Sequence, residues 1–307
     1  MSLDATCKTQ ATISEADLPL DPLLSGEAQA LALIVGTEGP SYRPVGAAMA
    51  LDGAGRRWGN LSSGCIEEDV ALHAAQAIEN GMARQLRYGQ GSPFRDLELP
   101  CGGGLDILIL PMPDRDVLRQ IHTQLGCRAP VTLYVDPEAG RISAVPMAAP
   151  LHVTIQPELR FLVFGKGPEA QIFAATAHLA GYQVALYSPS IEPVGQSGGL
   201  ESFHLTSARW PDGVLPDAYT AVTLFFHDHE WEPPLLEAAL RSPAFFVGAQ
   251  GSLRSHQARC AALVQRGLSA ADIGRISAPF GLIPSARDPR TLAVSVLADV
   301  LAQAMAR

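Results

Sequence analysis

A glycine loop between two apolar runs constrains the fold of this chain more than any other feature. Residues 160–164 and 183–187 are apolar, and between them lie a G-x-G-x-x-A loop and a helical pattern. Strand, glycine loop, helix and strand in this order predict a βαβ unit of a parallel, Rossmann-like sheet. Glycine backbone at a helix N-terminus binds phosphate, so NAD(P) is a candidate cofactor and the candidate cofactor-binding residues are Gly165, Gly167 and Ala170.

One part of a dinucleotide site is missing from this unit. The second predicted strand should end in an acidic residue that binds the ribose hydroxyls, but Ser188 stands there. Three alternatives remain open: another dinucleotide is bound, the ribose is held in another way, or the unit is structural. A hydride-transfer pair such as Tyr and Lys is not recognisable in the sequence, which weighs against an oxidoreductase.

Later apolar runs at 221–226 and 244–247 predict further strands of the same sheet. The loops after these strands begin with His227 and Gly248, at carboxyl ends, where open α/β sheets bind ligands. We therefore expect both residues to line the ligand crevice. His227 and His229 alternate on the chain, but two imidazoles without a third ligand are weak evidence for a metal site.

Two glycine-flanked cysteines stand out in the first third of the chain. Cys65 follows Gly64 and precedes a helical pattern, and Cys101 precedes a run of glycines that begins at Gly102. Glycine lets a ligand approach closely, and a helix N-terminus favours the thiolate, a soft ligand for metal or sulfur. The acidic first turn of that helix opposes this effect. Cys65 and Cys101 are therefore candidate metal ligands, with Gly64 and Gly102 beside a bound cofactor. The alternatives are that Cys65 is a small core residue that caps the helix, and that the glycines after Cys101 only mark a tight turn.

Two charged residues near Cys65 have a functional and a structural interpretation. Glu67 could move protons beside the thiol and so belong to the cofactor site, or could be an ordinary first-turn helix charge. Arg43 lies in a loop rich in Gly and Pro, and either binds a phosphate in bidentate fashion or braces the loop. The remaining cysteines are expected to be inert: Cys7, Cys127 and Cys260.

Charge and cysteine content limit the class of protein. The net charge of −9, without any cluster of basic residues, argues against nucleic-acid binding. The apolar runs are too short to span a bilayer, and the opening residues lack the apolar core of a signal peptide. Five widely spaced cysteines among 307 residues favour reduced thiols over disulfides. We expect a cytoplasmic protein that binds neither nucleic acid nor membrane.

These patterns predict an α/β protein of two units. The first covers residues 1–113 and handles the cofactor, and the last, 159–307, is a Rossmann-like, doubly wound parallel sheet. Between them, 114–158 is rich in Pro and Asp and is interpreted as a connecting region. It contains one predicted hairpin, in which the runs 131–135 and 141–145 flank a turn.

Motifs spread over nearly the whole chain resemble the xanthine dehydrogenase accessory protein family, XdhC/CoxI. In the first unit they are Gly39-Pro40-Ser41-Tyr42-Arg43-Pro44-Val45-Gly46, Ser62-Ser63-Gly64-Cys65-Ile66-Glu67 and Pro100-Cys101-Gly102-Gly103. In the second they are Gly248-Ala249-Gln250-Gly251-Ser252 and Ala278-Pro279-Phe280-Gly281-Leu282. The family usually has Ser-Gly-Gly-Cys around the first cysteine, so Ser63 is a mild departure.

The resemblance implies an XdhC/CoxI-type α/β domain followed by a Rossmann-like domain. It implies a chaperone, more than an enzyme, that binds molybdenum cofactor (molybdopterin) and supports its sulfuration by a cysteine desulfurase. The cofactor would then be inserted into an apo molybdenum hydroxylase of the xanthine dehydrogenase type, and a homodimer is implied as well. The alternatives are an NAD(P)-binding oxidoreductase and a docking module without catalytic activity.

Overall fold

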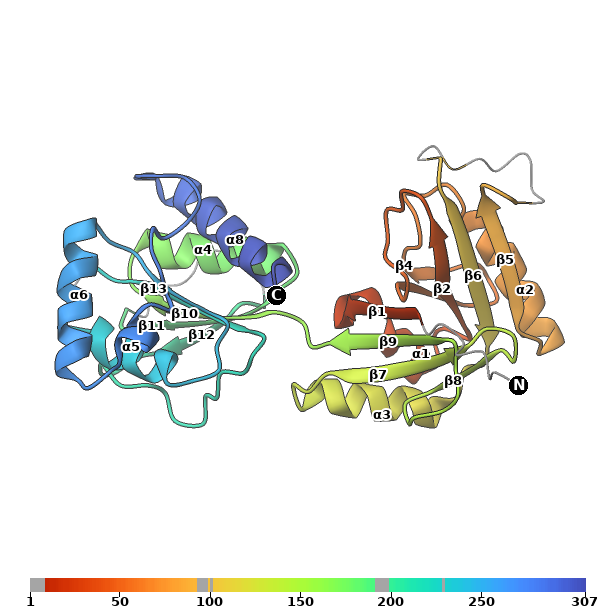
Figure 1. Ribbon diagram of the computed structural model, residues 1–307, viewed down its shortest axis with the longest axis horizontal. Helices are drawn as coiled ribbons and strands as arrows, with labels where there is room; N and C mark the ends of the chain where they lie inside the picture. Colours follow the sequence, from red (N-terminus) through yellow and green to blue (C-terminus); the bar gives the residue numbers. More distant parts are fainter. Residues whose placement is uncertain (1–8, 93–98, 100–101, 191–198, 228–229) are drawn as a thin grey trace, which may run out of the picture. The chain divides into compact units, whose positions relative to one another are not determined.

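The computed structural model describes residues 9–92, 99, 102–190, 199–227 and 230–307. The chain divides into two compact units, Met1–Pro157 and Glu158–Arg307, each with its own hydrophobic core (Figure 1). Across these residues, no helix combines the length and the apolar character that crossing a membrane requires.

A five-stranded antiparallel sheet forms the centre of the first unit. In spatial order it contains β4 (Arg57–Gly59), β3 (Ala48–Leu51), β2 (Ala30–Glu38), β6 (Gly104–Pro111) and β5 (Arg84–Gly89). β2 and β6 pair so that Glu38 lies opposite Gly104. The loop that leaves β2 and the loop that enters β6 therefore lie at the same end of the sheet.

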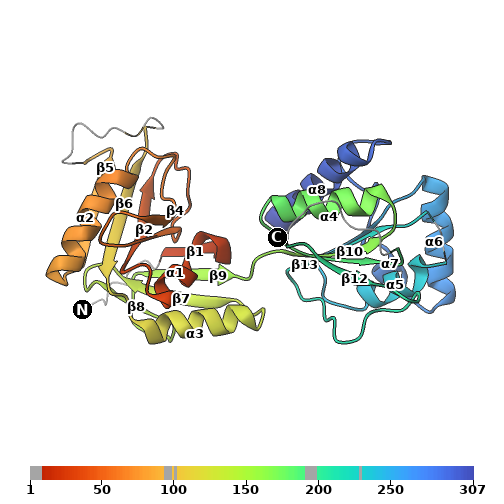
Figure 2. The same cartoon turned by 180° about the vertical axis from the view of Figure 1, so that it is seen from behind.

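Both faces of this sheet are covered, because β2 is apolar on both sides. Ala32 and Ile34 belong to one core together with α2 (Glu67–Asn80), whereas Leu31 and Leu33 belong to the other. The second core is completed by α1 (Leu20–Ser25), α3 (Arg115–Gly126) and a smaller sheet (Figure 2). The short η1 (Glu15–Asp17) precedes α1 and has no buried residue. In spatial order that sheet contains β1 (Thr9–Ser14), β9 (Leu151–Gln156), β7 (Val131–Asp136) and β8 (Arg141–Ser143).

The segment 114–158, interpreted above as a connecting region, supplies α3, β7, β8 and β9 to the first unit. Leu118 of α3 and Leu133 of β7 are buried in the same core as Leu31 of β2. The hairpin expected from the sequence is the antiparallel pair β7–β8. In the structure, then, the boundary between the two units falls between Pro157 and Glu158.

The second unit is a six-stranded, all-parallel sheet. Its strands are β10 (Arg160–Gly165), β11 (Gln183–Ser188), β12 (Glu201–His204), β13 (Thr220–Phe225), β14 (Phe246–Ala249) and β15 (Ile276–Ser277). The spatial order β12-β11-β10-β13-β14-β15 is that of a doubly wound Rossmann sheet, which confirms the predicted fold class. The order reverses between β10 and β13, and ligands of such sheets bind at this switch point.

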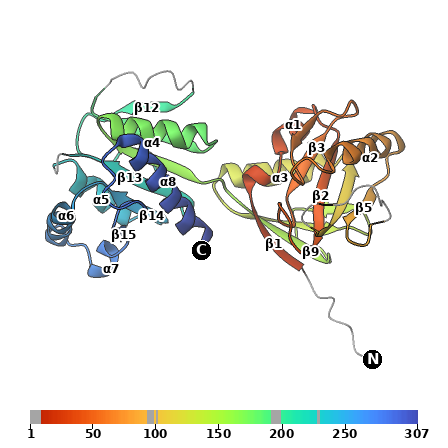
Figure 3. The ribbon, with the colours of Figure 1, turned by 90° about the horizontal axis from the view of Figure 1, so that it is seen from above.

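Helices cover both faces of the parallel sheet. α4 (Pro168–Leu179) and α8 (Pro289–Met305) pack side by side on one face, as Figure 3 shows. α5 (Glu232–Leu240) and α6 (Leu253–Gln265) lie on the other, followed by the short α7 (Ala270–Ile273). Because both faces are covered, the carboxyl ends of the strands and the loops that follow them form one edge of the sheet.

Candidate functional site

Three loops of the first unit meet at one end of its five-stranded sheet. They are residues 39–46 after β2, residues 60–66 before α2, and residues 102–103 before β6. The approach is close, because a Cβ on Gly103 would lie 2.2 Å from the carbonyl oxygen of Pro40. The motifs that the sequence places far apart are therefore neighbours in space.

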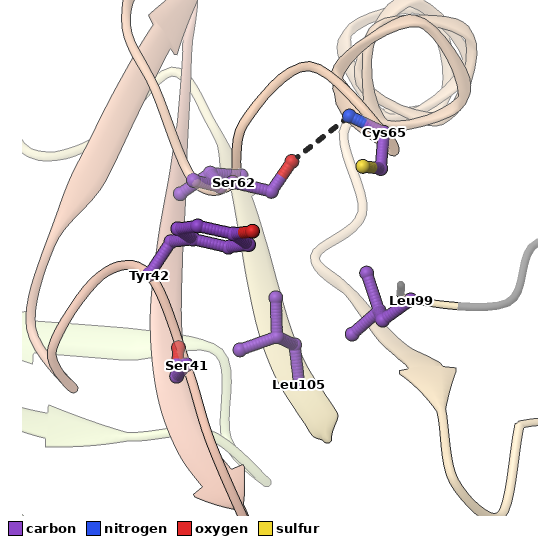
Figure 4. A pocket seen from close by; sticks show the side chains of 7 residues that line it. Ser41, Tyr42, Ser62, Cys65, Leu99 and Leu105 are labelled. Atoms are coloured by element: carbon purple, nitrogen blue, oxygen red, sulfur yellow. Dashed lines mark hydrogen bonds between the residues drawn. The ribbon is translucent and has the colours of Figure 1, made fainter. Parts of the chain in front are cut away.

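A small hollow lies where these loops meet (Figure 4). It is lined by Ser41, Tyr42, Leu61, Ser62, Cys65, Leu99 and Leu105. The Sγ of Cys65 points into the hollow, and the side chain of Tyr42, 64% exposed, stands at its mouth. The free space is about 10 Å³, roughly that of one water molecule. A cofactor would therefore meet the thiol at the surface of these loops and not inside them.

Ser62 fixes the backbone that carries Cys65. Its Oγ accepts hydrogen bonds from the backbone N–H groups of Gly64, at 3.2 Å, and Cys65, at 3.1 Å; Figure 4 draws the second. Its hydroxyl in turn donates to Oε2 of Glu67 over 2.8 Å. Ile66, the N-cap of α2, provides no capping side chain. The hydrogen bonds of the Ser62 side chain shape the turn before this helix instead.

Glu67 is buried, with 6% of its surface exposed, and its carboxylate binds the same loop. Besides the Ser62 hydroxyl, it accepts the backbone N–H groups of Leu61 at 3.2 Å, Ser62 at 2.7 Å and Ile66 at 3.2 Å. Burial alone would raise the pKa of Glu67, but these hydrogen bonds outweigh it and lower that pKa. In the structure, Glu67 is a charged anchor for the Cys65 loop.

Gly64 leaves one side of Cys65 open. Its φ of +99° lies in the left-handed region that favours glycine, and a Cβ there would have no atom within 4 Å. The Oγ of Ser63 lies 3.6 Å from the Cys65 Sγ. A ligand that approaches the thiol from this side would meet backbone and a hydroxyl group.

Arg43 is engaged within the first unit. Its Nη2 lies 2.5 Å from Oδ1 of Asp17, while its Nε is buried without a hydrogen-bond partner among the described residues. The ion pair neutralises the guanidinium and matches the loop-bracing interpretation. A contact between Arg43 and a cofactor phosphate stays a prediction.

The second candidate metal ligand, Cys101, lies outside the described residues, as do Cys7 and His229. Gly102 is described: its φ is +71°, and its N–H donates to the carbonyl oxygen of Leu99 over 2.8 Å. Of the other cysteines, Cys127 is exposed, and the Sγ of Cys260 lies 3.5 Å from the imidazole of His256. Within the described ranges, no three His, Cys, Asp or Glu side chains are grouped to hold a metal ion.

In the second unit, the glycine loop joins β10 to α4 and lies at the switch point. A Cβ on Gly165 would lie 2.5 Å from the carbonyl oxygen of Phe225 and 2.9 Å from the Cβ of Ala170. Gly165 and Ala170 therefore let β10, β13 and α4 pack closely. Gly167 is the N-cap of α4, with a φ of +82°.

His227 and Gly248, both named from the sequence, lie close to neighbours that the sequence did not indicate. His227 follows β13, and its Nε2 lies 3.4 Å from Oε1 of Glu169. Gly248 gives room to the ring of Phe280, which would lie 2.6 Å from a Cβ at that position. His227 thus lies at the crevice, and Gly248 is explained by packing.

This crevice does not fit NAD(P) well. β11 ends in Ser188 and offers no carboxylate for the ribose hydroxyls. Pro168 at the start of α4 lacks the N–H that would bind a phosphate, and the Glu169 carboxylate lies close to Gly167.

A cavity of about 910 Å³ lies at the carboxyl ends of β13, β14 and β15. Its wall includes apolar Phe280 and Leu292 and the buried Arg259. Arg259 pairs with the buried Glu232 at 3.0 Å and donates to the carbonyl oxygen of Gln250 over 2.8 Å. The buried pair therefore fixes the loop that follows β14.

The sequence did not indicate the side-chain pairings that fix these loops. Ser62 and Glu67 meet because the loop before α2 folds back on the first turn of that helix. Glu232 and Arg259 are 27 positions apart on different helices. For Ser62 and Glu67 the sequence offered one signal, a serine shortly before an acidic helix start. For Glu232 and Arg259 it offered none.

Two family models match the chain. The XdhC and CoxI family model matches residues 23–89, and the XdhC Rossmann domain model matches residues 161–300. The molybdenum cofactor insertion chaperone PaoD of Escherichia coli K12 is 34% identical over 288 residues, which cover 92% of this chain and 85% of that protein. A probable xanthine dehydrogenase subunit of Bacillus subtilis 168 is 25% identical, over 92% of this chain and 95% of that one.

A solved structure extends the similarity to the fold. The crystal structure of a protein described as a xanthine dehydrogenase, from Bacillus halodurans, aligns with a TM-score of 0.76 at 20% identity, covering 96% of this chain and 97% of that one. At this identity the match concerns the fold alone. Because a family model matches each unit, and PaoD exceeds 30% identity over most of both proteins, the chain belongs to the XdhC and CoxI family.

Proposed function

We propose that this protein binds molybdenum cofactor at the Cys65 loop and inserts it into an apo molybdenum hydroxylase. The observation that carries the proposal is the presentation of Cys65: a partly exposed thiol at a helix start, with its backbone fixed by Ser62 and Glu67. Thiolate is a soft ligand suited to molybdenum, and an open glycine beside it leaves room for a bulky pterin. The name of the relative PaoD, a cofactor insertion chaperone, supports this function.

The finer parts of the proposal concern partners. We infer that the loaded protein presents its cofactor to a cysteine desulfurase for sulfuration before insertion, that it works as a homodimer, and that it acts in the cytoplasm. A hydroxylase of the xanthine dehydrogenase type is the expected recipient, and the name of the Bacillus subtilis relative supports that class. Acting as a carrier, the protein returns unchanged after each delivery.

An insertion assay tests the proposal. Apo molybdenum hydroxylase is incubated anaerobically with molybdenum cofactor, with and without this protein, and hydroxylase activity is followed. The wild type should raise the yield of active enzyme well above that with free cofactor, and Cys65→Ala should not. Cys127→Ala removes an exposed cysteine elsewhere in the first unit and should behave as the wild type. Equal activation by Cys65→Ala and wild type would contradict the proposal.

A further inference from the structure

The second unit places a carboxylate where a Rossmann fold receives a pyrophosphate. In such folds the second glycine of the loop lacks a side chain so that the phosphates can approach its backbone. Here that residue is Gly167, and the position of its missing Cβ lies 3.5 Å from Oε2 of Glu169. The Glu169 carboxylate, 15% exposed, therefore lies beside the backbone that the phosphates would approach.

Several features hold this carboxylate in place. Its Oε1 lies 3.4 Å from Nε2 of His227, which follows β13 on the other side of the switch point. Glu169 also belongs to the first turn of α4, where the helix dipole favours a negative charge. Pro168, one position earlier, offers no N–H to a competing phosphate. The N-terminus of α4, which would stabilise a bound anion, already stabilises the Glu169 carboxylate.

We propose that Glu169 determines ligand specificity in the second unit, by excluding pyrophosphate-bearing ligands such as nicotinamide dinucleotides from the crevice. A pyrophosphate placed against Gly167 would lie next to the Glu169 carboxylate in a partly desolvated crevice, where like charges repel strongly. The cavity of about 910 Å³, whose wall includes Glu169 and His227, is then open to ligands that carry no pyrophosphate.

Calorimetric titration of the full chain tests this proposal, with NADH, NADPH and inorganic pyrophosphate as probes. The wild type should bind none of them up to millimolar concentration. Glu169→Ala removes charge and bulk, and Glu169→Gln removes the charge alone. Both should bind pyrophosphate or a dinucleotide at least about tenfold more tightly than the limit set by the wild type.

Glu201→Ala is the matched control, because it removes an exposed carboxylate at the amino end of β12, away from the glycine loop. It should bind no better than the wild type. Tight binding of NADH or NADPH by the wild type would overturn the proposal. It would equally be overturned if both Glu169 variants, folded by circular dichroism, gained no affinity for any probe. Neither outcome bears on cofactor binding by Cys65, which belongs to the first unit.

Discussion

At the scale of single residues, the candidate site depends on a buried carboxylate, Glu67, that anchors the loop of a partly exposed thiol, Cys65. The Glu67 carboxylate accepts hydrogen bonds from backbone N–H groups of the loop and from the Ser62 hydroxyl. Ser62 in turn accepts a hydrogen bond from the backbone N–H of Cys65, whose thiol is partly exposed. Backbone hydrogen bonds to a carboxylate are among the stronger ones, because the acceptor is charged. The thiol is therefore presented from a fixed loop.

Replacing Glu67 by Gln should loosen this loop. The amide keeps the shape of the side chain, but one of its ends turns from acceptor to donor and faces backbone N–H groups. We expect a loss of about 1–3 kcal/mol in the free energy of unfolding, measured with urea. Glu68→Gln, at an exposed neighbouring position, is the control and should change little. A stability of Glu67→Gln equal to that of the wild type would show that the carboxylate anchors nothing.

The same residue predicts a pH dependence. Because the pKa of Glu67 is lowered on folding, its contribution to stability is complete above the unfolded value of about 4.3 and is lost as pH falls through the folded value. The stability difference between the wild type and Glu67→Gln should therefore be largest near neutral pH and shrink in acid. Urea unfolding of both proteins across this range measures it. A difference that grows on acidification would contradict the lowered pKa.

Residue types could be predicted from the sequence better than their roles. Cys65 next to a helix start is visible in the sequence, and the structure places it there. Glu67 was expected as an ordinary helix charge or a proton carrier, because nothing in a linear pattern shows that residues 61–66 fold back over its carboxylate. Arg43 was assigned to a phosphate or to bracing its loop, and its pairing with Asp17 joins positions 26 apart.

At the scale of elements, closely packed loops bring the family motifs together. β2 and β6 pair out to Glu38 and Gly104, so the loops beyond them are forced into contact. Gly103 lies at the tightest point, against the carbonyl oxygen of Pro40. Gly103 of this motif thus serves the approach of backbone to backbone.

Gly103→Ala should separate these loops. The added Cβ would overlap the Pro40 carbonyl, and overpacking of this kind costs about 1–3 kcal/mol. We expect a lower thermal midpoint and reduced cofactor retention, measured by calorimetry and metal analysis. Gly126→Ala, at the end of α3 where a Cβ meets nothing within 4 Å, is the control. If Gly103→Ala melted and bound as Gly126→Ala does, the close approach would not matter.

Apolar runs predicted the central strands β10 and β13 of the second unit, since strands buried on both faces read as continuous apolar segments. β1 and β9 were not predicted, because their pairing joins segments that lie 142 positions apart, as Thr9 does with Leu151. α3 buries only a narrow stripe, Leu118, Ile121 and Leu125, and its Asp-rich surroundings read as a connection. α5, for which the sequence analysis made no prediction, begins at Glu232 with two prolines in its first turn, where proline is tolerated.

At the scale of the whole molecule, the two units have separate cores. The buried clusters of the first unit draw on residues 13–155, and those of the second on residues 161–300. The first unit carries the partly exposed thiol of Cys65, and the second carries a Rossmann sheet whose glycine loop packs strands closely. We infer that cofactor handling and the second unit's ligand specificity are separable properties.

Because the two units have separate cores, a destabilising substitution in one unit should leave the stability of the other unchanged. Glu232→Gln removes one partner of a buried ion pair in the second unit and should cost that unit about 3–5 kcal/mol. Urea unfolding can be followed through Trp58 for the first unit and Trp210 for the second, in variants that keep one of the two tryptophans and replace Trp231. The Trp210 transition should move to lower urea while the Trp58 transition stays. Equal shifts in both transitions would contradict independent cores.

The most direct test of the account is the amount of molybdenum and pterin that the protein retains after anaerobic reconstitution and gel filtration. The wild type and Cys127→Ala should retain both in equal proportion, and Cys65→Ala should retain neither above background while melting as the wild type does. Retention by folded Cys65→Ala equal to that of the wild type would contradict the claim that Cys65 holds the cofactor.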